Sequence, residues 1–171
     1  MAKNKGKEFE EEFRKDFKKS FPNSFLLRLP DQQSQYYGGS SNPCDFITYA
    51  DDKLFLVECK SCLGNTFSFT NLRQYDKLKD YRNLPGVHAC VILWMIDHDE
   101  VLYIPICAVT ACKQDNLKSF NVKTTDRNKY EIINVPSIKK RTFMASDYTF
   151  LKQLPEDITI EEKINKNREG S

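Results

Sequence analysis

Two acidic residues, Asp45 and Glu58, are spaced so that a β-hairpin would bring them together. Asp45 precedes one apolar run, Asp51-Asp52 turns the chain, and a second apolar run ends at Glu58. If Asp51-Asp52 is the hairpin tip, Asp45 lies directly opposite Glu58 on the same face, with Cβ atoms about 4.5–5.5 Å apart. Like charges placed there destabilise a sheet. A divalent cation such as Mg²⁺, which prefers hard oxygen ligands, is the simplest reason for the pair.

A lysine shares the face that carries the two acids. Lys60 follows Glu58 by two residues, so strand alternation puts it on the same face and turns Cys59 the other way. Apolar residues occupy both faces of this strand, which predicts a central strand covered on both sides. Lys, Asp and Glu are rarely buried unless they pair or bind something. The spacing favours a functional cluster, and an ordinary ion pair at a strand end is the alternative.

The first helix is expected to position one further acid. Residues 6–21 have the period of an amphipathic helix whose apolar side carries Phe9, Phe13, Phe17 and Phe21. Glu10 lies within this apolar arc, whereas Glu8, Glu11 and Glu12 point away from it and are expected to be ordinary solvated charges. We therefore expect Glu10 either to extend past the helix end or to reach toward the carboxylate pair.

The other predicted elements complete an α/β fold with a mixed central sheet flanked by helices. In chain order they are a strand at 24–29, a polar loop at 30–41, a helix at 70–83 capped by Thr70, strands at 87–96 and 101–106, a short helical or irregular segment at 107–116, a strand at 129–135 and a helical turn at 147–153. We expect a single domain over residues 1–155 and a polar C-terminal tail over 156–171, ordered only through its contacts.

Composition narrows the class of protein without identifying a partner. The chain has 171 residues, the size of one domain, and 26 basic residues nearly balance 24 acidic ones. Affinity for DNA would therefore have to come from local basic patches. We expect no membrane span, no signal peptide and a cytoplasmic location, because the chain starts with polar residues and holds no long apolar run.

The six cysteines do not predict a zinc site or a disulfide framework. Cys59, Cys90 and Cys107 lie in apolar runs, where a reduced cysteine behaves as a small apolar residue. Cys59 and Cys62 have a zinc-like spacing, but no second pair of ligands lies at a fitting distance.

Several segments together resemble the PD-(D/E)xK nuclease superfamily, whose core is restriction-endonuclease-like. Within it, the chain is most similar to the RecU-type Holliday junction resolvases of Gram-positive bacteria and their phages. The matching segments are 4–10, 41–45, 58–60 and 67–74, within a likeness that covers residues 4–106. The chain departs from that family in two places: a short segment replaces the long stalk before the catalytic aspartate, and Arg73 stands where a histidine commonly precedes the helix glutamine.

The resemblance implies roles for five residues. Asp45 and Glu58 would be metal ligands, Lys60 the catalytic lysine, Glu10 the helix acid, with possible metal contact through water, and Gln74 a supporting residue. The metal would be Mg²⁺, for which Mn²⁺ can substitute. By its chemistry, the site could also use the backbone carbonyl of Cys59 as a metal ligand.

Candidate DNA contacts come from the polar loop and from basic residues near the predicted helix. They are Arg28, Tyr36, Tyr37, Gly39, Ser40, Ser41, Lys53, Lys77, Lys79 and Arg82. The two tyrosines would stack on bases at a branch point, or they would only close the loop onto the core.

These expectations combine into a Mg²⁺-dependent endonuclease that resolves four-way junctions in branched double-stranded DNA by symmetric cleavage as a homodimer. Such an enzyme would serve DNA recombination and repair or phage DNA processing. Two alternatives stay open: a nuclease of the same superfamily with another DNA substrate, of restriction or repair type, and a non-catalytic DNA-binding recombination accessory protein.

Overall fold

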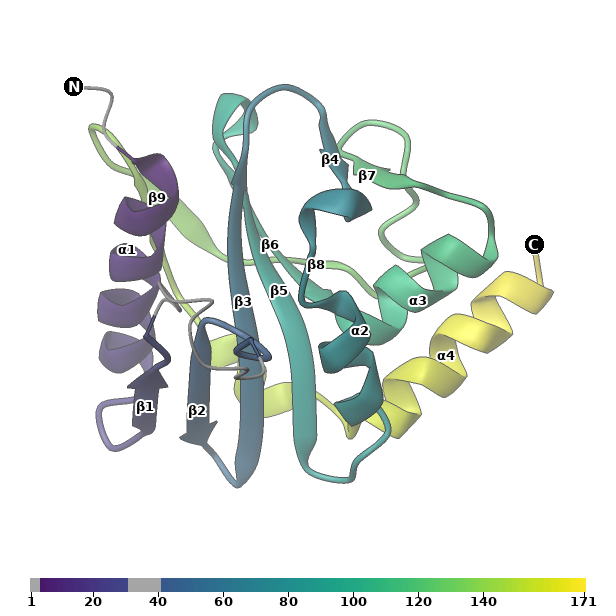
Figure 1. The fold of residues 1–171 in the computed structure, drawn as a ribbon, viewed down its shortest axis with the longest axis horizontal. Helices are drawn as coiled ribbons and strands as arrows, with labels where there is room; N and C mark the ends of the chain where they lie inside the picture. The colour runs from purple at the N-terminus through teal and green to yellow at the C-terminus, as the bar shows by residue number, and fades with distance from the viewer. Residues whose placement is uncertain (1–3, 31–40) are drawn as a thin grey trace.

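A six-stranded mixed sheet forms the centre of the protein, with helices on both faces (Figure 1). The computed structural model describes residues 4–30 and 41–171. In spatial order the strands are β1 (Phe25–Arg28), β2 (Phe46–Ala50), β3 (Lys53–Cys62), β5 (Val87–Met95), β6 (Glu100–Pro105) and β8 (Ile133–Asn134). β3 and β5 pair in parallel, and the other neighbouring strands pair antiparallel. The expected α/β fold with a mixed central sheet is confirmed.

Among the described residues, two small antiparallel pairs and four α-helices surround this sheet. The pairs are β4 (Thr66–Ser68) with β7 (Ser119–Asn121), and β9 (Ser137–Lys139) with β10 (Met144–Ser146). The helices are α1 (Lys5–Ser20), α2 (Tyr75–Leu78), α3 (Ile106–Gln114) and α4 (Asp157–Glu169). Short 3₁₀ turns span Phe69–Asn71, Lys79–Tyr81, Ile96–His98 and Thr149–Gln153. No helix in the described part of the chain is long and apolar enough to cross a membrane.

The two faces of β3 belong to two separate cores because strand residues alternate in direction. Phe55, Val57 and Cys59 pack with α1 and the β9–β10 hairpin in one core. Leu56, on the other face, packs with residues of α3 and α4. Figure 1 shows α1 on one side of the sheet and α2, α3 and α4 on the other. β3 is therefore the covered central strand that its apolar residues on both faces predicted.

The β2–β3 hairpin has the predicted register. Ala50 pairs with Lys53 and Phe46 pairs with Val57. Asp51 and Asp52 form the tip, with φ angles of 50° and 60°. Aspartate tolerates this left-handed region better than most residues, and two successive positive φ angles match the twist of a tight hairpin. The tip thus determines which residue of β2 meets which residue of β3.

Helix α1 packs its phenylalanine side against the sheet and against the C-terminal part of the chain. Phe9, Phe13 and Phe17 are buried, as the helical period predicted. The Asp16 carboxylate accepts a hydrogen bond from the backbone N–H of Ser146 (2.7 Å), and the Ser20 hydroxyl accepts one from Tyr148 (2.9 Å). α1 is thereby tied to residues that lie far away in sequence.

Two predicted elements differ from the structure. The helix expected over 70–83 is broken into a 3₁₀ turn, the short α2 and a second turn, and the hydroxyl of Ser68 caps it in place of Thr70. The strand expected over 129–135 shortens to the two residues of β8. In the second segment, Glu131 has a φ angle of 54°, a left-handed conformation that interrupts an extended strand.

The predicted polar tail is wrong as a description of residues 156–171. Most of the segment forms α4, whose Ile160 and Ile164 are buried in the same core as α3. These residues lie one helical turn apart, so they share one face. Asp157 is buried at the start of the helix, with Oδ1 2.7 Å from Nδ1 of the buried His88. Two isoleucines, this contact and the pairing of Arg168 with Asp115 at 2.6 Å dock an otherwise polar helix.

Candidate active site

Asp45 is held against β3 by two hydrogen bonds. Its backbone N–H donates to the carbonyl of Val57 (3.0 Å), and its Oδ2 accepts from the backbone N–H of Cys59 (2.8 Å). Together with the pairing of Phe46 and Val57, these bonds continue the hairpin register by one residue. Asp45 therefore lies across from Glu58, as the spacing predicted.

Glu58 is a buried carboxylate with one close cation. Its side chain is fully buried, and Oε1 lies 2.7 Å from Nζ of Lys60, which remains partly exposed. Neither oxygen of Glu58 accepts an aligned hydrogen bond from the residues that the structure describes. Burial, followed by the charge of Asp45, raises the pKa of Glu58 to about 7, and Lys60 opposes this shift.

The carboxyl of Asp45 experiences the same crowding. Burial raises the pKa of Asp45, and the charge of Glu10 raises it further, whereas the N–H of Cys59 lowers it. Each of the two acids thus has an elevated pKa because it is removed from water beside another anion. A bound cation would relieve this strain more completely than Lys60 alone.

Glu10 approaches the pair from the other side of the sheet. Its Oε2 accepts hydrogen bonds from Arg28 of β1, at 2.7 Å from Nη2 and 3.1 Å from Nε. Its charge contributes to the raised pKa of both Asp45 and Glu58. α1, β1 and the start of β2 therefore bring Glu10, Arg28 and Asp45 into one charged cluster.

The other acids of α1 are not equivalent to one another. Glu11 pairs with Arg14 at 2.6 Å and is about half exposed, as expected of a side chain that points to solvent. Glu12 pairs with Lys15, but its side chain is only 15% exposed. The expectation that Glu12 simply faces solvent is wrong, because it lines a hollow together with Phe143 of the β9–β10 connection.

Gln74 lies beside Asp45 at the entrance to α2. Both residues line a hollow of about 380 Å³, together with Arg73, Asn42 and Ser41. The side-chain oxygen of Gln74 is buried and has no hydrogen-bond donor among the residues that the structure describes. The hollow thus places an unpaired acceptor near the acids, where a water or a cation would satisfy it.

The donor set fits a hard divalent cation. In an extended strand, the N–H and C=O of one residue point to the same side, so the carbonyl of Cys59 points to the β2 side, where its N–H meets Asp45. Asp45, Glu58 and this carbonyl supply oxygen ligands. Within residues 4–30 and 41–171, no three His, Cys, Asp or Glu side chains form a ready cluster. Mg²⁺ commonly uses one or two carboxylates and completes its shell with water and substrate phosphate, so the set is adequate.

The structure places only part of the predicted DNA-contact set near the acids. Tyr36, Tyr37, Gly39 and Ser40 lie outside the described residues. Ser41 lines the hollow, and Lys77 donates to the Ser41 carbonyl and, at 2.6 Å, to its hydroxyl.

The remaining basic candidates have intramolecular partners. Lys79 pairs with Asp76 at 2.8 Å, Arg82 lies 3.6 Å from Glu161 of α4, and Lys53 donates to Asp51 at the hairpin tip. Neither the hairpin tip nor α4 contributes a residue to the hollow beside Asp45, and Lys79 is not one of its lining residues either. We therefore assign none of these three residues to the site. The fourth basic candidate, Arg28, donates its hydrogen bonds to Glu10.

Sequence reasoning did not identify Arg73 and Asn42 as lining residues of the site. Both sit in irregular backbone, Asn42 where its amide donates to the carbonyl of Pro30 (2.6 Å). Loop residues carry no periodic signal. Only their proximity in sequence to Gln74 and Asp45 could have suggested them.

Comparison with known proteins adds one structural likeness. No protein-family model and no curated protein matches the chain. It is similar to the 1.6 Å structure of Hjc, a Holliday junction resolvase from the archaeal hyperthermophile Archaeoglobus fulgidus, with 19% sequence identity and a TM-score of 0.43. The likeness covers 60% of this chain and 78% of Hjc. The site itself must therefore support any statement of function.

Proposed function

We propose that this protein is a Mg²⁺-dependent endonuclease of the PD-(D/E)xK superfamily that hydrolyses phosphodiester bonds of DNA. The observation that carries the proposal is the pair formed by the buried Glu58 and the half-buried Asp45, with Lys60 at 2.7 Å from Glu58. Clusters of buried ionisable groups whose pKa values are shifted by burial and by one another are typical of catalytic sites.

Each residue of the cluster has a chemical role in this proposal. Asp45, Glu58 and the Cys59 carbonyl hold the cation, and Mn²⁺ is expected to substitute for Mg²⁺. When bound, the cation supplies a Lewis acid that neutralises charge developing on the phosphate. Lys60 orients the attacking water and offsets negative charge at the phosphate. Gln74, with its unpaired oxygen, positions water or the lysine.

Glu10 and Arg28 complete the site from the other side. Arg28 neutralises Glu10 in the absence of substrate. A DNA phosphate would compete with Glu10 for this guanidinium, which is suited to bidentate contact with phosphate oxygens. Glu10 would then be released toward Asp45 and would contact the cation through a water.

We further propose that the substrate is a four-way DNA junction, cut symmetrically by a homodimer. Support comes from the likeness of residues 4–10, 41–45, 58–60 and 67–74 to the RecU-type resolvases. Two-fold symmetry of a dimer would match the two scissile strands of a junction.

The deciding experiment compares a synthetic four-way junction with a linear duplex of the same sequence, each with Mg²⁺, with Mn²⁺ and with EDTA. We expect paired nicks in the junction, none in EDTA, and none with Glu58→Gln. Glu11→Gln is the matched control, because it removes an acid from the exposed side of α1 and should cut normally. Equal cutting of both substrates would indicate a nuclease with another substrate. Binding without cutting under every metal condition would indicate a non-catalytic accessory protein.

A further inference from the structure

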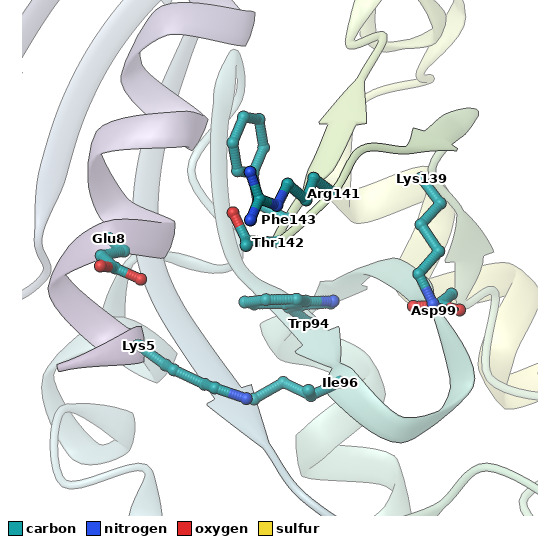
Figure 2. Close-up of a pocket in the computed structure, with 9 residues that line it drawn as sticks. All are labelled: Lys5, Glu8, Trp94, Ile96, Asp99, Lys139, Arg141, Thr142 and Phe143. Carbon is teal, nitrogen blue, oxygen red and sulfur yellow. Dashed lines mark hydrogen bonds and ion pairs between the residues drawn. The ribbon is translucent and has the colours of Figure 1, made fainter. Parts of the chain in front are cut away.

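A second hollow lies between the start of α1 and the β9–β10 hairpin, outside the candidate active site (Figure 2). Its volume is about 360 Å³, and Trp94 and Phe143 supply its aromatic lining. Figure 2 shows Trp94 across the middle of the hollow, with Lys5 on one side and Arg141 and Phe143 on the other. None of its lining residues has a role in the site described above.

Trp94 has a polar edge without a partner. The residue is 5% exposed, and its ring packs against Phe9 with 5.7 Å between ring centroids. Its Nε1–H finds no acceptor among the described residues. In Figure 2 the indole nitrogen points to the side where Lys139 and Asp99 lie. A buried donor without a partner is destabilising, so an acceptor that reached this edge would be favoured.

The charges around the hollow favour an anion. Three cationic and two anionic side chains line it, and one anion, Asp99, is neutralised by Lys139 at 2.6 Å. Lys5 and Arg141 are exposed, and neither forms an ion pair within the described part of the chain. Two cations are therefore available to a ligand beside an aromatic surface.

Two elements, β3 and α1, carry both a residue beside Trp94 and a residue of the candidate active site. Trp94 is paired across the sheet with Ser61, the neighbour of Lys60. Phe9, which contacts Trp94, is the neighbour of Glu10. Paired strands lie about 4.8 Å apart. Because residues alternate along β3, Ser61 and Trp94 face α1 whereas Lys60 faces the other side of the sheet, so a DNA strand that occupied both places would have to pass Glu10 at α1.

We propose that this hollow binds one nucleotide of the DNA strand next to the cleavage site. Arg141 and Lys5 contact the phosphate, and the base lies against Phe143, where an acceptor on its edge takes the indole N–H of Trp94. Basic grooves with aromatic side chains are the usual means of holding single-stranded nucleic acid. The assignment rests on the proposed function, because it takes DNA to be the substrate.

The chain offers a direct optical test, since Trp94 is its one tryptophan. The emission of Trp94 is followed while the full-length protein, in EDTA to prevent cleavage, is titrated with a single-stranded oligodeoxynucleotide of about ten nucleotides. We expect saturable quenching. Arg141→Ala should weaken the affinity about tenfold, and Lys140→Ala less than about twofold. Lys140 is the matched control because it is an exposed cation beside Arg141 that does not line the hollow.

Trp94→Phe keeps a ring and removes the N–H. Its affinity, measured by the anisotropy of a labelled oligonucleotide, should fall several-fold while the far-UV circular dichroism stays unchanged. If that variant does not fold, the comparison of Arg141→Ala with Lys140→Ala still decides the question.

Three results would overturn the assignment. They are equal losses for Arg141→Ala and Lys140→Ala, DNA binding without any change in Trp94 emission, and binding of dAMP as tight as that of the oligonucleotide, which would indicate a site for free mononucleotides. Mg²⁺-dependent cleavage separates the two proposals. Cleavage without quenching removes only this nucleotide site, whereas saturable quenching in a protein that cuts no DNA removes only the nuclease.

Discussion

Replacing Glu58 with glutamine should stabilise the metal-free protein, and the gain should depend on pH. The pKa of Glu58 is raised from 4.5 to about 7, mainly by burial and then by Asp45. Between these two values the folded protein binds more protons than the unfolded chain, so its stability falls as pH rises through that window. Glutamine has nearly the same shape as the protonated acid and does not titrate.

The size of the effect follows from the shift. One pKa unit corresponds to about 1.4 kcal/mol, so the wild-type protein should lose about 3 kcal/mol between pH 4.5 and 8 through this group. For a chain of this size, that difference corresponds to roughly 6–12 °C in melting temperature. Glu58→Gln and wild type should therefore melt together near pH 4.5, and the variant should melt higher at pH 8.

Thermal unfolding followed by circular dichroism in EDTA measures this difference. Glu11→Gln is the control: the hydrogen bond from Arg14 lowers the pKa of Glu11, so its loss should give no gain at high pH. Adding Mg²⁺ at pH 8 should raise the melting temperature of the wild type and leave Glu58→Gln unchanged. A constant difference between wild type and variant at all pH values would refute the crowding of Asp45 and Glu58.

Three further predictions test other parts of the structure. Glu10→Gln should slow Mg²⁺-dependent nicking at least tenfold, and Glu11→Gln should slow it less than twofold. Equal losses in the nicking assay would show that the position of an acid on α1 does not decide its effect on cleavage. Asp157→Ala leaves the buried His88 without its partner and should lower the free energy of unfolding in urea by about 1–3 kcal/mol; no loss would mean that the pair does not hold α4. Ile164→Ala should lower the free energy of unfolding in urea by about 3 kcal/mol, because α4 is part of the core. An unchanged urea midpoint would show that α4 does not contribute to the stability of the core.

The parts of the site that could be predicted from sequence are those with short-range periodicity. Asp45 and Glu58 meet because a two-residue tip and a period of two determine every pair in the hairpin. The helical period predicts Glu10 on the apolar side of α1, and its contact with Arg28 of β1 agrees with that position. In each case, the geometry depends on residues within one element or one turn.

The features that sequence did not predict depend on contacts between distant segments. Glu12 is covered by the connection around Phe143, and the hollow at Trp94 exists only because that connection returns to α1. α4 is docked by His88, about seventy residues away, and by two isoleucines in a polar segment. Local propensity carries no information on such long-range packing, which overrides it.

The bonds from α1 to residues 146 and 148 bear on how the protein folds during synthesis. A chain emerging from the ribosome presents Phe13 and Phe17 long before Tyr148, whose ring packs against both. Until then, part of the apolar side of α1 lacks its final cover, and exposed surfaces of this kind bind chaperones or aggregate. α1, which carries Glu10, therefore gains this part of its packing only after residues 146–148 have been synthesised. Under the proposed function, a polypeptide that ends before Tyr148 would therefore hold Glu10 less firmly beside Asp45.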